Sequence, residues 1–264
     1  MLQQAIEFKE ESRALHALLK DLEPADYERQ TQFKSWTVHD VLGHLHLFNV
    51  AAEMSLNDEP AFMVLLEEIM PTIGVKDGMR SYTNTWLGPL QGPALLDAWW
   101  QFVVKMSDSF ASADPKRRLK WFGPDMSVRS SITARLMETW AHGQELYDLL
   151  GRERVNFDRI KNIAHLGVST YGWAFRNRGL PIPDPAPHVR LMAPSGAIWE
   201  WNTPDPQNAV EGDAAEFCQV VTQVRNIADT SLKLSGDTAK RWMEIAQCFA
   251  GPPETPPAAG TRGR

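Results

Sequence analysis

The stretch that decides the fold is SWTVHDVLGHL, at residues 35–45. Thr37 precedes Asp40 by three positions, a spacing typical of a capping box, in which each side chain accepts a hydrogen bond from the other residue's backbone N–H. A helix is therefore predicted to begin near Val38. Apolar residues then recur every three or four positions as far as Phe48, which predicts that one face of this helix is buried.

Segments on both sides of this stretch have the same helical periodicity. Residues 71–92 are rich in Gly, Pro, Thr and Asn and are predicted to form a long loop. The predicted helices cover residues 6–22, 38–70 with a break near 57–60, 93–113, 130–150 and 157–178. We interpret residues 1–180 as a helical bundle together with the helix that follows it.

The composition changes after residue 180. The segment PIPDPAP, residues 181–187, is incompatible with a helix or a central strand and is predicted to be a stiff linker. Short β-like runs and two helices follow, which predicts a small α/β domain over residues 181–250. Residues 251–264 are rich in Pro, Gly and Ala and are predicted to be a disordered tail. The predicted fold class is α+β, with a helical bundle followed by a small α/β domain.

Composition and charge argue against several classes of function. The net charge is −6 and the longest basic cluster spans only residues 116–120, so nucleic-acid binding is not expected. No run approaches the roughly 18 apolar residues that cross a membrane, and residues 1–11 do not resemble a signal peptide. The two cysteines, Cys218 and Cys248, fit neither a disulfide framework nor a CxxC pair, which predicts a cytoplasmic protein with reduced, packed thiols.

Glu138 and His142 are the first candidates for chemistry. They are four positions apart in a predicted helix and therefore lie about 40° apart on one helical face. A carboxylate and an imidazole at this spacing can converge on one divalent ion. The alternative interpretation is a surface hydrogen bond or a weak ion pair, which is common at this spacing.

Three histidines on the helix that begins near Val38 differ in their positions on the helical wheel. His44 lies within the apolar arc and is predicted to face the bundle interior, whereas His39 and His46 lie outside the arc and are predicted to face solvent. His44, Glu138 and His142 could therefore share one inner metal site. Two imidazoles and one carboxylate would leave coordination positions open for water or substrate.

Arg135 lies three positions before Glu138, near the same face of its helix. It could bind a substrate carboxylate, orient Glu138, or form an ordinary structural ion pair. The ten tryptophans are numerous, and some could line an apolar pocket beside the metal, although core packing is the alternative for each of them.

Two of these segments resemble one known family. Residues 36–45 resemble the W-t-v-x-d-v-l-x-H-L motif of DinB-like metalloproteins and, more closely, of the mycothiol-dependent maleylpyruvate isomerase N-terminal domain. Residues 135–145, RLMETWAHGQE, resemble the second motif of that family, R-x-x-E-x-x-x-H-x-x-D. Residues 210–218 and 246–253 look like those of actinobacterial relatives described as metal-binding. The resemblance places the metal ligands of the family on His44, Glu138 and His142.

The resemblance implies a DinB-like four-helix bundle, a divalent ion with Zn²⁺ as the first choice, and a C-terminal domain similar to the sterol-carrier-like domain of the isomerase. It implies an enzyme in which the ion activates a thiol such as mycothiol, or water, against a small electrophilic or carbonyl substrate, as an isomerase or a thiol transferase. A thiol-independent lyase or hydratase, and a non-catalytic metal-containing binding protein, are the alternatives. A small molecule is the expected partner, and a homodimer is compatible with the sequence.

One element of the small domain departs from the family pattern. Isomerase-type members carry Thr-Gly-Arg there, with the Arg serving the thiol or the substrate, whereas this chain has TQVR at residues 222–225. Strict register aligns Val224 with that Arg and leaves Arg225 one position later. Arg225 is therefore the candidate catalytic residue of the small domain, beside Arg135 of the bundle.

Overall fold

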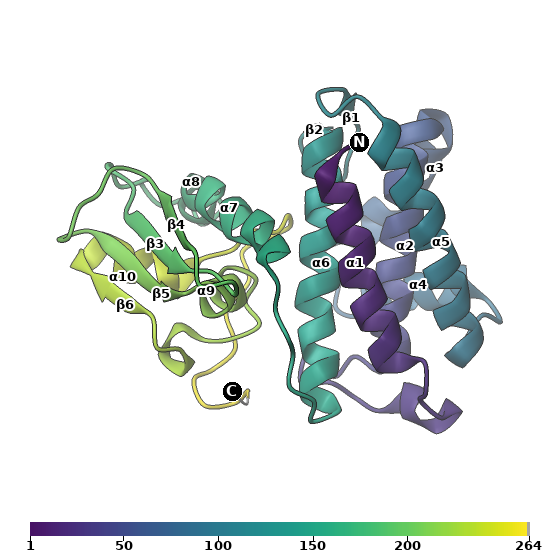
Figure 1. The fold of residues 1–264 in the computed structure, drawn as a ribbon. Helices are drawn as coiled ribbons and strands as arrows, with labels where there is room; N and C mark the ends of the chain where they lie inside the picture. Colours follow the sequence, from purple (N-terminus) through teal and green to yellow (C-terminus); the bar gives the residue numbers. More distant parts are fainter. Residues whose placement is uncertain (263–264) are drawn as a thin grey trace. The chain divides into compact units, whose positions relative to one another are not determined.

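The computed structural model describes residues 1–262 of the chain. It divides into two compact units, Met1–Glu153 and Arg154–Arg264, which we call the helical unit and the sheet unit (Figure 1). The predicted fold class, a helical region followed by a small sheet domain, is confirmed. The sequence predicts a domain boundary at residue 180, whereas the structure divides after Glu153. The two helices between these positions, at residues 161–169 and 171–176, pack on helices later in the chain.

Four long helices form the core of the helical unit. They are α1 (Gln3–Leu19), α2 (Val38–Asn57), α5 (Gly92–Ser112) and α6 (Val128–Leu149). Helices α1 and α2 each pack against both α5 and α6, so the four helices enclose one shared core (Figure 1). The shorter elements of this unit are η1 (Pro24–Glu28), α3 (Glu59–Ile69), η2 (Met70–Thr72), α4 (Gly78–Leu87), β1 (Arg118–Leu119) and β2 (Met126–Ser127).

Helix α2 begins where the sequence predicts. Asp40 N–H donates to Thr37 Oγ1 at 3.1 Å, and Thr37 N–H donates to Asp40 Oδ2 at 2.9 Å, which confirms the capping box. The helix ends at Asn57, and Asp58 caps the next helix by accepting a hydrogen bond from Ala61 N–H. The predicted break near residues 57–60 is therefore a true helix boundary.

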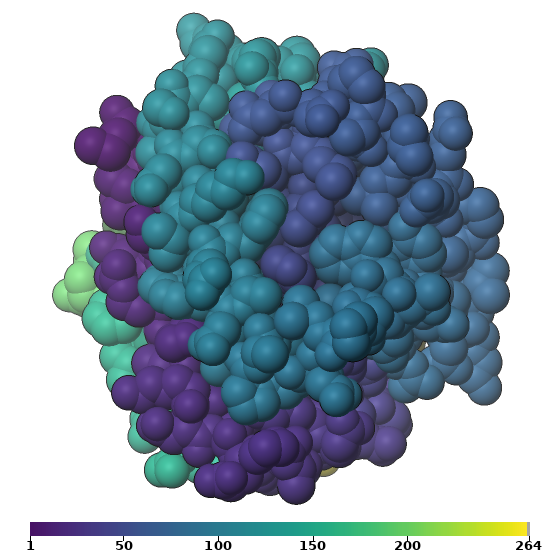
Figure 2. Space-filling model, turned by 90° about the vertical axis from the view of Figure 1, so that its right-hand side faces the viewer, coloured from purple at the N-terminus to yellow at the C-terminus, as the bar shows by residue number. Residues whose placement is uncertain are grey.

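Helix α4 lies within the segment predicted to be a long loop. Its aromatic residues Tyr82 and Trp86 pack against the cluster around Phe62, and tertiary contacts of this kind override a loop-like composition. Gly43 of α2 allows the close approach of α4, because a Cβ at this position would lie 2.7 Å from Leu87 Cδ1. Figure 2 shows the outer face of the helical unit, most of which is formed by α3, α4 and α5.

Large apolar side chains fill the core of the helical unit. Trp99, Phe110 and Phe8 are completely buried. Burial of an aromatic side chain of this size contributes about 1.5–3 kcal/mol to stability, which helps to set the alignment of the helices that carry them.

The sheet unit contains a four-stranded sheet in the order β4-β3-β5-β6. Strand β3 pairs in parallel with β5 and antiparallel with β4, and β6 is antiparallel to β5. The strands are β3 (His188–Met192), β4 (Ile198–Trp201), β5 (Ala209–Asp213) and β6 (Lys233–Ser235). The helices are η3 (Asp158–Ile160), α7 (Lys161–Ser169), α8 (Tyr171–Arg176), α9 (Ala214–Val221), η4 (Ile227–Asp229) and α10 (Gly236–Ile245).

Close packing of α7 on α9 explains why the unit boundary precedes α7. A Cβ at Gly167 would lie 2.8 Å from Val221 Cγ2 and 3.1 Å from Phe217 Cε1, so the glycine lets the two helices approach. The proline-rich residues 181–187 contain no helix or strand and lie inside this unit.

The C-terminal segment is held by side chains of the sheet unit, in contrast to the disorder expected for residues 251–264. Asn226 Nδ2 donates to Pro257 O at 2.8 Å, and Gly260 N–H donates to Asp229 Oδ1 at 2.8 Å. A proline-rich segment lacks N–H donors but keeps its carbonyl acceptors, which polar side chains can satisfy. Residues 263–264 of the predicted tail lie outside the described residues. None of the helices within residues 1–262 is long and apolar enough to cross a membrane.

Candidate metal centre

Helices α2 and α6 bring His44, Glu138 and His142 into one cluster. Glu138 Oε2 lies 3.4 Å from His44 Nε2 and 3.3 Å from His142 Nε2. One ligand atom from each of the three residues lies within 4.8 Å of the other two. The predicted convergence of these side chains from two distant segments is therefore present in the structure.

The two separations from Glu138 Oε2 to the imidazole nitrogens fit a shared divalent ion. Zinc lies about 2.0–2.2 Å from imidazole nitrogen and carboxylate oxygen, so two ligand atoms at a tetrahedral angle are roughly 3.4 Å apart. The two measured distances to Glu138 Oε2, 3.4 and 3.3 Å, agree with this value. The donor set of two imidazoles and a carboxylate is also one that zinc and other first-row divalent ions accept.

The protonation states of the cluster suit metal binding. Burial lowers the pKa of His44 to about 4, although the hydrogen bond to Glu138 acts in the opposite direction, so this imidazole is neutral at pH 7. Burial alone would raise the pKa of Glu138, but hydrogen bonds from His142 and His44 outweigh it and hold this pKa well below its usual value. A neutral imidazole and an ionised carboxylate are the forms that bind a cation.

Aromatic rings hold the two imidazoles in place. The Trp36 ring lies parallel to the His142 ring at a centroid distance of 6.0 Å and an interplanar angle of 6°. The His44 ring lies between Trp36, at 5.3 Å, and Phe48, at 4.7 Å. Among residues 1–262, His44 Nδ1 is buried without a hydrogen-bond partner, so ring packing and the hydrogen bond between Nε2 and Glu138 orient this imidazole. Phe48 was predicted only as part of the apolar face of the helix, although its position four residues after His44 places it on the same side as this imidazole.

A short loop before α2 supplies two of these rings. Phe33 contacts His142 edge-on at a centroid distance of 5.1 Å. Thr31 fixes the loop, because its Oγ1 donates to Trp36 O at 2.9 Å and accepts from Phe33 N–H at 3.2 Å. Lys34 and Ser35 both adopt positive φ values, 50° and 55°, which L-residues rarely adopt. Helical periodicity does not encode loop geometry of this kind, so Phe33 could not be predicted as part of the site.

Arg135 lies on α6 close to the cluster and is almost completely buried. Its Nε donates to Asn49 Oδ1 at 3.0 Å, and one terminal nitrogen lies 3.5 Å from Leu45 O. Burial lowers the pKa of Arg135 to about 10, and the nearby negative charge of Glu138 opposes this change. Arg135 therefore contributes a positive charge to the environment of Glu138, while its hydrogen bonds are made with α2.

The two other histidines of α2 differ in burial. His39 is partly exposed, whereas His46 is buried. The prediction that His46 faces solvent is therefore wrong. Its ring lies 5.6 Å from both Trp86 and Phe102, because α4 and α5 cover that side of α2. Burial lowers the pKa of His46 to about 4.

Arg225 belongs to the sheet unit, where it is 2% exposed and donates to Val224 O at 3.1 Å. Gln223 adopts a positive φ of 58°, which favours glycine. Cys218 and Cys248 are both free and buried, and burial raises the pKa of the Cys218 thiol well above its usual value.

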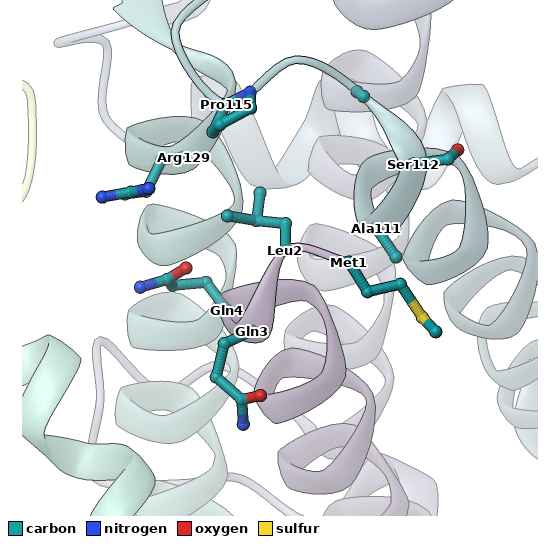
Figure 3. Close-up of a pocket in the computed structure, with 9 residues that line it drawn as sticks. Met1, Leu2, Gln3, Gln4, Ala111, Ser112, Pro115 and Arg129 are labelled. Carbon is teal, nitrogen blue, oxygen red and sulfur yellow. The ribbon is translucent and has the colours of Figure 1, made fainter.

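A cavity of about 570 Å³ lies elsewhere in the helical unit (Figure 3). It is lined by the start of the chain, including Gln3 and Gln4, by the end of α5 and by Arg129 of α6. None of the three cluster residues lines it, so this cavity does not add to the candidate site.

The fold and the site define a class of protein in which a helical unit with a His/Glu/His cluster precedes a small sheet unit. Residues 8–147 match the sequence model of the mycothiol maleylpyruvate isomerase N-terminal domain. The chain belongs to this family, as its two motifs predict.

Two relatives match most of the chain, and two solved structures share its fold. Two uncharacterized proteins from two strains of Mycobacterium tuberculosis are each 37% identical over 248 residues, which cover 94% of this chain and 95% of theirs. The crystal structures of the mycothiol-dependent maleylpyruvate isomerase and of a histidine-to-alanine mutant of it are 14% identical. They superpose with TM-scores of 0.52 and 0.53 over 83% of this chain and 87% of theirs, which shows a shared fold.

Proposed function

We propose that His44, Glu138 and His142 bind one divalent ion and that the protein is a metal-dependent enzyme acting on a small electrophilic or carbonyl substrate. The observation that carries this proposal is the approach of both imidazole Nε2 atoms to one oxygen of Glu138, at 3.4 and 3.3 Å. A structural metal is a weaker explanation, because the helical unit already has a large apolar core. Zn²⁺ is the ion that best suits two imidazoles and a carboxylate with positions left open.

The proposed chemistry is activation of a thiol. A divalent ion at this position supplies Lewis-acid chemistry, which favours the thiolate, the nucleophilic form of a thiol, at neutral pH. The family name supports mycothiol as this thiol and an isomerase or thiol-transferase reaction as the outcome. The chain's own contribution is to hold the His44 imidazole neutral, to pack both imidazoles against aromatic rings, and to keep the carboxylate of Glu138 ionised.

Arg135 is proposed as a positioning residue. Its guanidinium is buried beside Glu138 and is hydrogen-bonded to Asn49 and Leu45 on α2. In this position it favours the ionised form of Glu138 and holds α6 in register with α2, which carries His44. In the sheet unit, Arg225 is proposed to contact the thiol or the substrate.

Elemental analysis of the purified, zinc-reconstituted chain tests the metal proposal. We expect about one ion per chain in the wild type and in the control His39→Ala, which removes a partly exposed imidazole from the same helix. His142→Ala should lower zinc affinity by more than about 100-fold, because removal of a ligand costs more than loss of an outer-shell contact. Wild-type protein without metal after reconstitution would contradict the proposal.

The reaction is tested with the zinc-loaded chain, mycothiol and maleylpyruvate. Thiol-dependent isomerisation supports the proposed activity. Turnover of a carbonyl substrate without thiol would instead indicate a lyase or hydratase. Tight thiol binding without turnover would indicate a non-catalytic binding protein.

A further inference from the structure

A set of aromatic side chains surrounds the His44–Glu138–His142 cluster. We call it the aromatic rim. Its members are Phe33, Trp36, Phe48, Trp121 and Phe122. The first three contact the imidazoles directly, with centroid distances between 4.7 and 6.0 Å.

The rim continues from α2 onto the β1–β2 hairpin. The Phe48 ring lies 6.3 Å from Trp121 and 5.3 Å from Phe122, both in the turn between the two strands. Ser55 Oγ anchors this turn by donating to Lys120 O at 2.6 Å. The rim is thus a fixed surface that extends from the cluster across two elements.

The rim is only partly buried. Phe33, Phe48, Trp121 and Phe122 are half-buried, while the fully buried Phe62 stacks on Trp121 at 6.0 Å and an angle of 8°. Four half-buried rings close to a polar cluster form an apolar surface that water solvates poorly. A ligand with a flat apolar body would remove this surface from water.

Two cations lie near the rim, and they differ in exposure. Exposed Lys34 has its Nζ 5.4 Å from the Phe33 ring centroid. The Arg135 guanidinium carbon lies 5.8 Å from the Phe48 ring centroid, but this side chain is buried, and its Nε and one terminal nitrogen contact Asn49 and Leu45. Recognition of a carboxylate typically requires a guanidinium with two N–H groups free for the ligand. For contact with a substrate, the helical unit therefore provides aromatic rings and not an accessible guanidinium.

We infer that the aromatic rim binds the planar, apolar body of the substrate beside the metal site. The substrate class is then an aromatic or conjugated electrophile that has one polar end directed at the metal. This inference rests on the proposed function and specifies its substrate. Phe33 and Phe122, at the two ends of the rim, are the specificity-determining residues.

Two hydroxamates test the inference, because both chelate zinc through the same group and differ only in a phenyl or a methyl substituent. Benzohydroxamate and acetohydroxamate are titrated calorimetrically into the zinc-loaded full-length chain. We expect benzohydroxamate to bind at least about tenfold more tightly. Phe122→Leu should reduce this preference to about threefold or less, with acetohydroxamate affinity unchanged within about twofold, because Phe122 contacts no imidazole of the cluster. Phe33→Leu should also reduce the ratio of the two affinities to about threefold or less.

Phe102→Leu is the matched control. Phe102 is also half-buried, but its ring contacts His46 and not the cluster, so the phenyl preference should persist in this variant. Acetohydroxamate binding shows that each variant is folded and loaded with metal. Equal affinities of the two probes in the wild type would overturn the inference and leave the metal proposal intact.

The same titrations on chelator-treated protein separate the two proposals. If reconstitution yields no metal, the proposed function fails. A phenyl preference that persists without metal and is lost in Phe33→Leu would still support the rim. If no metal can be loaded and the metal-free wild type shows no phenyl preference, the inference is overturned as well.

Discussion

The side chains of His44 and Glu138 meet across 94 positions of sequence, with 3.4 Å between His44 Nε2 and Glu138 Oε2. His142 reaches the same carboxylate oxygen from one helical turn further along α6. The packing of α2 against α6 creates this arrangement, so changes in metal occupancy and in helix packing should affect each other.

Metal should stabilise the helical unit. A ligand that binds only the folded state at 100 times its Kd adds about 2.7 kcal/mol of stability. For a protein of this size, zinc should therefore raise Tm by roughly 5–10 °C above that of chelator-treated protein. Differential scanning calorimetry at fixed free zinc measures the shift. His142→Ala should show little or no shift, and a shift equal to that of the wild type would argue against a role of this residue as a ligand.

A larger side chain at Gly43 should force α4 away from α2. The Cβ of Gly43→Val would lie 2.7 Å from Leu87 Cδ1 and 3.1 Å from Thr83 Cγ2. We expect this substitution to reduce the free energy of unfolding by about 1–3 kcal/mol, because overpacking outweighs the small gain in helix propensity. Urea denaturation measures the change. In the Leu87→Ala background the same substitution should cost less, and strictly additive effects would refute the proposed contact.

Loss of the Thr31 hydroxyl should loosen the loop that carries Phe33 and Trp36. Thr31→Val preserves the shape of the side chain but removes its hydrogen bonds to Phe33 N–H and Trp36 O. A reduction in stability of about 1–2 kcal/mol is expected, because the part-buried Phe33 N–H loses its acceptor, whereas Trp36 O keeps the hydrogen bond from Thr31 N–H. Thr85→Val, at an exposed position on α4, is the control and should change stability by less than about 0.5 kcal/mol. Similar losses in both variants would show that Thr31 does not hold the loop.

Cys218 should be unreactive in the folded protein. Burial raises the pKa of its thiol well above 9.0, the nearby Cys248 adds to this effect, and the side chain has no exposed surface. Iodoacetamide at pH 8 should label Cys218 at least about 100-fold more slowly in native protein than in urea, as measured by mass spectrometry. Rapid labelling of native protein would contradict this assignment.

The same raised pKa predicts the sign of a pH effect. The unfolded chain can ionise this thiol above about pH 9, whereas the folded chain cannot until a higher pH. The contribution of Cys218 to stability is therefore fully present below pH 9 and is lost as the pH rises further. Cys218→Ala should flatten the dependence of the unfolding free energy on pH in this range. An unchanged pH dependence in this variant would refute the assignment of the effect to Cys218.

Local sequence patterns were sufficient to predict the helices that carry the cluster residues and the shared face of Glu138 and His142. The capping box at Thr37 and Asp40 set the start of α2, and the spacing of Glu138 and His142 put both on one face of α6. These features depend on neighbours within one helical turn, which is why a single sequence determines them.

Tertiary packing decided what covers each helical face. His46 is buried because α4 packs on its side of α2, and the aromatic rim exists because a strained loop and a β-hairpin reach the cluster from different parts of the chain. Packing of α7 on α9 likewise explains why the boundary between the two units follows Glu153 and not residue 180, where the sequence predicts it. Periodicity states which face of a helix is apolar, but the identity of the segment that covers that face depends on contacts between residues far apart in the sequence.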